Sequence, residues 1–117
     1  MAILVLTSTA FATNWIFVKR AMVFYFDTDS AYKNSDNITF WSFGVWDRVR
    51  NDGVKKAMVH YEATLSTPRY YRQTEGYLYD EQNNELQHDV NVREWQRVPS
   101  NNSTIEKLID FAFTYAK

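Results

Sequence analysis

The chain has 117 residues, with 13 basic and 14 acidic side chains and a formal net charge of −1. This length fits one domain, and the near-neutral charge argues against a general nucleic-acid-binding protein or a polybasic membrane anchor. The lack of cysteine excludes disulfides, thiolate metal sites, a cysteine nucleophile and cysteine-linked lipid anchors. Aromatic residues make up 17% of the sequence, which favours a sheet-rich fold because flat rings pack well on pleated strands.

The opening segment MAILVLTSTAFATNW joins an apolar run at 2–6 to small and hydroxyl residues, followed by Ala10-Phe11-Ala12. An apolar segment before an A-x-A site is typical of a secretory signal peptide, although the usual positively charged start is missing. We therefore expect 1–12 to be a truncated signal peptide, cleaved after Ala12, and 13–117 to form a single domain. The alternative is that 2–6 form a buried strand. The run is too short to span a bilayer, so no transmembrane segment is predicted.

The next part of the chain predicts an antiparallel sheet. Short aromatic and β-branched runs at 14–20 and 22–27 indicate two strands. The segment 27–37 is rich in Asp, Ser and Asn and is typical of a connecting loop. The run at 38–46 is apolar on both alternating faces, which predicts a central strand covered on both sides.

Residues 55–66 alternate regularly between apolar and polar side chains, which predicts a half-exposed strand. In this pattern Lys56 and His60 face the solvent. The preceding Asn51-Asp52-Gly53 indicates a hairpin turn, because Asp-Gly tolerates a positive φ angle.

Thr67-Pro68 separates this strand from the next one, predicted at 69–80. Within that strand, Gly76 marks a bulge or a close backbone approach. A polar turn then leads to a weaker strand near 86–92.

The C-terminal segment changes to a helical period, which predicts a helix over about 103–116. Its apolar stripe consists of Ile105, Leu108, Ile109, Ala112 and Ala116. Ser103 and Glu106 have the spacing of a capping box at the start of that helix. The predicted fold class is therefore α+β: an antiparallel β-sheet meander with one C-terminal α-helix packed across it.

The motifs of common enzymes are missing from the sequence. Asp27 and Asp29 could offer carboxylates to a metal, but such a pair in a Ser-rich turn more often binds its own backbone. His60 and His88 lack the spacing of a helical metal site. There is no nucleophile elbow and no Gly-rich phosphate loop. We expect a non-enzymatic protein, with no catalytic residue, metal or cofactor.

A binding surface has more support, from basic and aromatic residues on two neighbouring strands. The candidate binding residues are Lys55, Lys56, Arg69, Tyr70, Tyr71 and Arg72. Exposed Tyr and Arg are typical anchors of protein interfaces, because both offer large contact areas and polar groups. The two lysines are expected at the far end of the hairpin from the RYYR segment. The alternative is an ordinary sheet face in which arginine stems lie over tyrosine rings.

Three segments resemble the surface-adhesin protein E family: VFYFDTDSAYKNSDNITFW, HYEATLSTPRYYRQTEGYLYD and REWQRVPSNNSTIEKLIDFAF. The resemblance covers the chain after residue 14. It implies an exported protein of a Gram-negative bacterium, folded as an antiparallel sheet with a C-terminal helix. Members commonly carry two cysteines, where this chain has residues near Thr64 and Phe113, so their disulfide is absent here.

The resemblance further implies a location in the periplasm, on the cell surface or outside the cell. It also implies a protein partner, since some members bind host extracellular matrix or plasma proteins. A second hypothesis is a periplasmic structural or accessory domain that binds itself or another bacterial protein. Exposed edge strands favour a homodimer in either case, because an unpaired edge is a template for another strand.

Overall fold

The computed structural model describes residues 15–19, 23–99 and 103–117. The expected signal peptide at 1–12 lies outside these residues. The strands are β1 (Trp15–Lys19), β2 (Val23–Asp27), β3 (Tyr32–Asn34), β4 (Asn37–Val45), β5 (Lys56–Thr64), β6 (Tyr70–Tyr79), β7 (Glu85–Asp89) and β8 (Gln96–Arg97). A 3-10 turn, η1 (Thr28–Ser30), and a helix, α2 (Thr104–Tyr115), complete the described elements.

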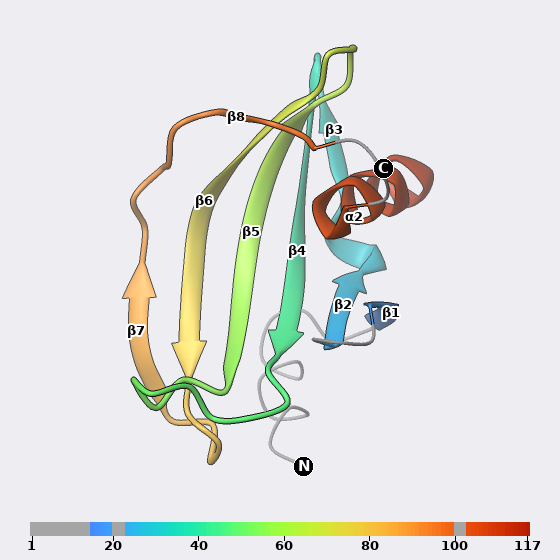
Figure 1. Ribbon diagram of the computed structural model, residues 1–117. Coiled ribbons are helices and arrows are strands. Elements are labelled where there is room, and N and C mark those ends of the chain that lie inside the picture. The colour runs from blue at the N-terminus through green and yellow to red at the C-terminus, as the bar shows by residue number, and fades with distance from the viewer. Residues whose placement is uncertain (1–14, 20–22, 100–102) are drawn as a thin grey trace.

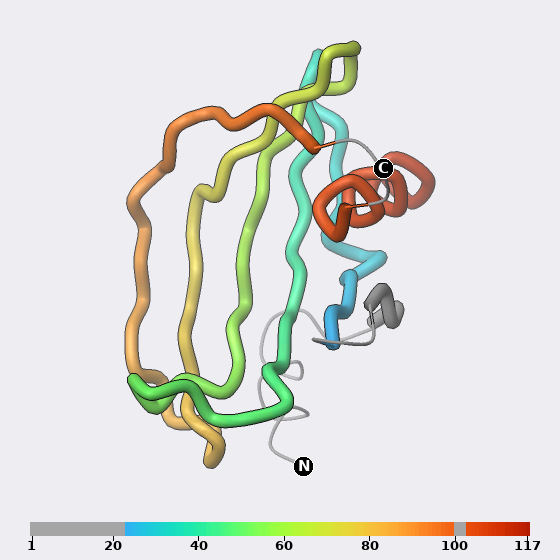
Figure 2. The backbone as a smooth tube through the Cα atoms, viewed as in Figure 1, coloured from blue at the N-terminus to red at the C-terminus, as the bar shows by residue number. Residues whose placement is uncertain are grey.

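The strands form one antiparallel sheet in the order β1-β2-β4-β5-β6-β7, with β3 beside β4 and β8 beside β6. Figure 1 shows β4, β5, β6 and β7 side by side as a meander, while α2 lies near the other end of the sheet. The segment that carries β8 crosses the top of the view and leads toward α2 (Figure 2). The predicted α+β class, with an antiparallel meander and one C-terminal helix, is confirmed.

The segment 27–37 contains η1 and β3, so its prediction as a connecting loop was wrong. Two of its polar side chains, those of Asp27 and Ser30, are buried and fix local structure. Asp27 Oδ1 accepts a hydrogen bond from the backbone of Asp29 at 3.0 Å, as expected for this Asp pair. Ser30 Oγ accepts one from the Trp41 backbone N–H at 2.9 Å, which fastens η1 to β4.

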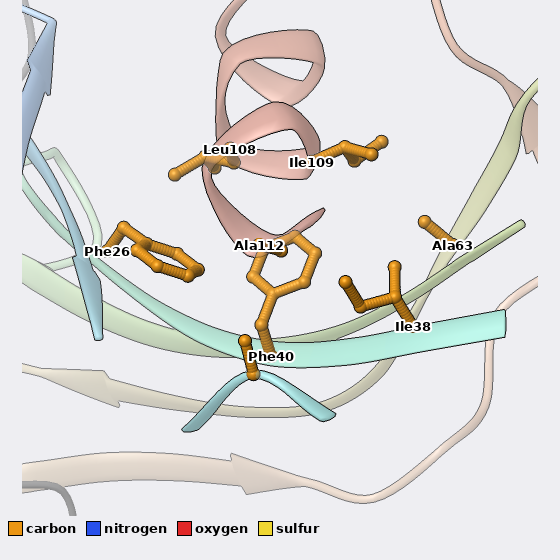
Figure 3. Packing of buried hydrophobic residues seen from close by; sticks show 8 residues of the cluster. Phe26, Ile38, Phe40, Ala63, Leu108, Ile109 and Ala112 are labelled. Atoms are coloured by element: carbon orange, nitrogen blue, oxygen red, sulfur yellow. The ribbon is translucent and has the colours of Figure 1, made fainter. Parts of the chain in front are cut away.

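One face of the sheet, the helix face, packs against α2. Figure 3 shows Leu108, Ile109 and Ala112 of the helix directed toward side chains of β2, β4 and β5. The strand residues of this cluster include Phe26, Ile38, Phe40 and Ala63, all with 0% exposed surface. Burying a side chain of the Leu, Ile or Phe type contributes about 1.5–3 kcal/mol, so this cluster is a main source of stability.

The helix begins where the capping pattern predicts it. Ser103 adopts an extended conformation, and its Oγ accepts a hydrogen bond from the Glu106 backbone N–H at 3.2 Å. The predicted apolar stripe is confirmed, since Leu108, Ile109 and Ala112 are buried while Ile105 and Ala116 are partly buried against the same cluster.

The opposite face of the sheet carries a second cluster, formed by Trp41, Phe43, Met58 and Tyr79. Because β4 contributes buried side chains to both clusters, the predicted burial of this strand on two sides is confirmed. We call the side of the sheet on which these four residues lie the opposite face.

The solvent-facing prediction for Lys56 and His60 was wrong. Lys56 is only 7% exposed, because its Nζ donates to the Glu81 carbonyl oxygen at 3.2 Å and to Asn83 Oδ1 in the turn after β6. His60 is half-buried, with its ring 5.0 Å from the ring of Trp41. Alternation along β5 assigned the face correctly, but the ring of Trp41 and the turn after β6 cover these two positions.

The turn prediction at Asn51-Asp52-Gly53 is confirmed: Gly53 has a φ of +86° and donates to the Arg50 carbonyl oxygen at 2.9 Å. The bulge lies at Thr74, two residues before Gly76, because His60 pairs with Glu75 and Tyr61 pairs with Gln73. Within residues 15–19, 23–99 and 103–117, no helix has the length and apolar character needed to cross a membrane.

Candidate binding surface

The structure divides the six candidate residues among three locations. Lys55 and Lys56 lie at the start of β5, where Lys56 pairs with Tyr79. The RYYR segment lies at the other end of β6, as predicted for this hairpin. Within that segment, successive residues alternate between the two faces of the sheet.

Arg69 and Tyr71 belong to the side of the sheet that carries α2. Arg69 Nη1 forms an ion pair with Asp110 Oδ1 of the helix at 2.6 Å. Tyr71 packs against the helix-face cluster, and its hydroxyl donates to Gln96 Oε1 at 2.9 Å. Both side chains therefore connect parts of the fold to each other.

Lys56 is held inside the fold at the other end of the hairpin. Desolvation lowers the pKa of Lys56, and the neighbouring Lys55 acts in the same direction, while the carboxylate of Asp80 opposes the change. Its ammonium group is used to fix the turn between β6 and β7. Lys56 is therefore not available to a partner, because only 7% of it is exposed.

Arg72 lies on the opposite face, where it is held by two groups at once. Its Nε and Nη2 are 2.9 and 2.8 Å from Glu62 Oε1 on the neighbouring strand. Its guanidinium carbon lies 4.3 Å from the ring centre of Trp95, within the range of a cation–π interaction. These contacts fix the guanidinium group while its side chain stays 30% exposed.

We name Glu62, Tyr70, Arg72 and Trp95 the Arg–Trp surface. Tyr70 and Trp95 are 37% and 38% exposed, so both rings offer apolar area to a partner. Glu62 is anchored on its other oxygen, since Asn37 Nδ2 donates to Oε2 at 2.7 Å. The surface therefore presents Arg72 and Trp95 in a fixed arrangement, with the exposed ring of Tyr70 on the same face.

A histidine-containing group lies next to this surface, on the same face. His60 Nδ1 is 2.6 Å from Thr74 Oγ1, and that hydroxyl is also 3.3 Å from the His60 carbonyl oxygen. Through these two contacts, the Thr74 side chain binds the neighbouring strand β5 at the β-bulge. Burial lowers the pKa of His60, while the negative charges of Glu75 and Glu62 oppose this effect.

His88 of β7 stacks on Tyr77 of β6, with ring centres 4.0 Å apart and an interplanar angle of 6°. Its Nε2 is 2.8 Å from Glu75 Oε2, and the Tyr77 hydroxyl donates to the same oxygen at 3.3 Å. The opposite face therefore carries aromatic and charged side chains on β5, β6, β7 and the segment after β7.

The sequence pattern pointed to Tyr70 and Arg72, but not to Glu62, Trp95 or the pair formed by Glu75 and His88. The position of Glu62 could have been inferred, because the hairpin between β5 and β6 places it directly opposite Arg72. Trp95 carried no such signal, since it follows β7 in an irregular segment. In the part of the chain that the structure describes, no group of three His, Asp or Glu side chains could hold a metal ion.

Comparison of the chain with protein-family models, curated proteins and solved structures finds no match.

Proposed function

We propose that this chain is a non-enzymatic binding protein that contacts another protein through the Arg–Trp surface. The resemblance to the surface-adhesin protein E family extends the proposal to an exported protein of a Gram-negative bacterium. In that setting the partner is a host extracellular matrix or plasma protein.

The observation that carries the proposal is the fixed position of Arg72 between Glu62 and Trp95. Trp, Tyr and Arg are the residues that most often dominate binding energy at protein interfaces. A side chain that is already ordered loses less conformational freedom on binding, which improves affinity. The Arg–Trp surface combines these residue types with this preorganisation.

A second candidate function is a periplasmic accessory domain that binds a second copy of itself through β7. This strand lies at the end of the strand order. Three apolar side chains in and after it are strongly exposed: Leu86, Val90 and Val92. An edge strand with exposed apolar residues favours pairing with another strand.

The binding proposal is tested with purified protein passed over immobilised fibronectin and collagen in a surface plasmon resonance experiment. We expect saturable binding that weakens at least tenfold, or about 1.4 kcal/mol, when Arg72→Ala or Trp95→Ala removes an anchor. Arg72→Ala should leave the fold intact, because Asn37 still binds Glu62.

Arg69→Ala is the matched control, since it removes an arginine three positions away that pairs with the helix instead. Binding that falls equally in both arginine variants would contradict the proposed surface. Light scattering of the same samples distinguishes the second candidate, pairing through β7, from the first. That candidate requires a dimer. Leu86→Lys should dissociate this dimer, whereas Arg72→Ala should not.

A further inference from the structure

A small cavity lies on the helix face of the sheet, away from the helix. Its volume is about 180 Å³, and its walls come from β5, β6, β7 and the segment after β7. Gly76 pairs with Val59, and β6 and β7 lie at the end of the sheet that α2 does not cover (Figure 1). The cavity is therefore separate from the Arg–Trp surface, which lies on the opposite face.

Gly76 forms part of this cavity, and the fold does not require glycine there. Its φ angle lies outside the left-handed range, so other residues can adopt this backbone conformation. An added Cβ would meet the Gln73 Nε2 atom at 3.0 Å, the end of a flexible side chain, and backbone only at 3.5 Å. Glycine weakens a strand, and inside one it often marks a bulge, a bend, or a place where a ligand or another backbone approaches closely.

Two amide side chains, those of Gln73 and Gln87, line the cavity. Within the described residues, neither amide has a hydrogen-bond partner. Each amide can donate and accept, so the pair offers hydrogen bonds in both directions to a ligand.

The charges in the cavity neutralise each other. Asp89 and Arg93 both line it, and they form an ion pair with each other. Hydrogen bonding from the Asn91 backbone, assisted by the charge of Arg93, lowers the pKa of Asp89, so its carboxylate stays charged. Val59 and Leu78 add apolar surface. A matching ligand is neutral, rich in hydroxyl groups and apolar on one side.

We propose that the cavity at Gly76 binds a single neutral sugar residue, with hydroxyl groups on Gln73, Gln87 and Asp89 and the apolar face of the ring on Leu78 and Val59. The volume supports one small group, because pockets for drug-sized ligands measure about 300–1,000 Å³. A hexose has about a dozen non-hydrogen atoms, for which dissociation constants on the order of 1–10 mM are expected.

The test is a titration of the ¹⁵N-labelled protein with D-glucose, D-galactose, D-mannose or N-acetyl-D-glucosamine up to 100 mM, followed by NMR. We expect at least one sugar to shift the Gly76 backbone amide and the side-chain amides of Gln73 and Gln87, with saturation. Gly76→Val fills the cavity and should weaken binding at least tenfold. Gln87→Ala, at an exposed position, should weaken it without risk to folding.

Arg72→Ala is the control, because it alters only the opposite face and should leave the sugar titration unchanged. D-glucuronate, the anionic counterpart of glucose, should bind no more tightly than glucose. The proposal is overturned if none of the four sugars shifts these amides, if the shifts persist in Gly76→Val, or if D-glucuronate binds more tightly. Loss of protein binding in the Arg–Trp variants would not alter this result, so the two proposals fail independently.

Discussion

His60 shows how the surroundings of one residue decide its role. Burial lowers the pKa of its imidazole below the ordinary value of 6.5, so the folded state holds the proton less readily than the unfolded chain. The unfolded chain keeps the ordinary value, so between the two pKa values the unfolded state binds a proton that the folded state does not. His60 therefore contributes stability above pH 6.5 that is lost progressively as the pH falls below it.

We predict that His60→Gln reduces the acid sensitivity of folding. Glutamine can retain a hydrogen bond to Thr74 but cannot titrate, so the variant should lose less stability than the unmodified chain between pH 7.5 and 5.5. The measurement is urea unfolding at both pH values. The second histidine, His88, is present in both proteins, so its contribution largely cancels. Equal losses in the two proteins would show that His60 has the same pKa in the folded and unfolded states.

Residue-scale errors in the sequence predictions have one physical cause. Lys56 and His60 were placed on the solvent side because polar residues alternate with apolar ones along β5. The alternation itself is real, since Tyr61 and Ala63 belong to the helix-face cluster. However, the turn after β6 covers Lys56, and the ring of Trp41 covers His60. Such contacts between distant segments cannot be predicted from the alternation of polar and apolar residues along one strand.

At the level of elements, α2 was the most predictable part of the fold because its signals are local. The apolar stripe and the capping residue lie within one segment, and both were confirmed. The short strands β3 and β8 were not predicted, since they have three and two residues and exist only through pairing with β4 and β6.

The helix start provides a prediction for Ser103. Replacing it with alanine removes the acceptor for the Glu106 N–H and the hydrogen bond that Ser103 donates to the Pro99 carbonyl oxygen at 2.9 Å. We expect Ser103→Ala to lower the free energy of unfolding by about 1 kcal/mol. The melting temperature, followed by circular dichroism, should fall by roughly 3–6 °C.

Ser103→Asp is the matched variant, because aspartate also caps helices and its charge suits the helix N-terminus. It should recover most of the lost stability. A melting temperature that stays low in Ser103→Asp would mean that the bond to Pro99, which aspartate cannot donate, matters more than the cap.

For the whole molecule, the important feature is that both hydrophobic clusters use the same two strands. Phe40 and Ala63 face the helix, while Phe43 and Met58 of the same strands face the other way. Because both clusters depend on the same backbone, disorder of β4 and β5 would remove the packing on both faces of the sheet. Loss of helix packing should therefore release the aromatic cluster as well, and a domain of this size is expected to unfold in one step.

This coupling is tested by Leu108→Ala, which removes a helix side chain that is 1% exposed. Such a substitution costs about 2–5 kcal/mol through lost burial and the remaining cavity. Urea unfolding should show the same lower midpoint by circular dichroism and by tryptophan fluorescence, which includes Trp41 on the opposite face.

Phe113→Ala is the control, because this residue of the same helix is 45% exposed. Lys33 Nζ lies 5.0 Å from the centre of its ring. Because the ring is so exposed, the midpoint should change little. If Leu108→Ala lowered the circular dichroism midpoint but left the fluorescence midpoint unchanged, the helix would detach from an intact sheet. The Arg–Trp surface, built on β5, β6 and the segment after β7, would then not depend on α2 for its geometry.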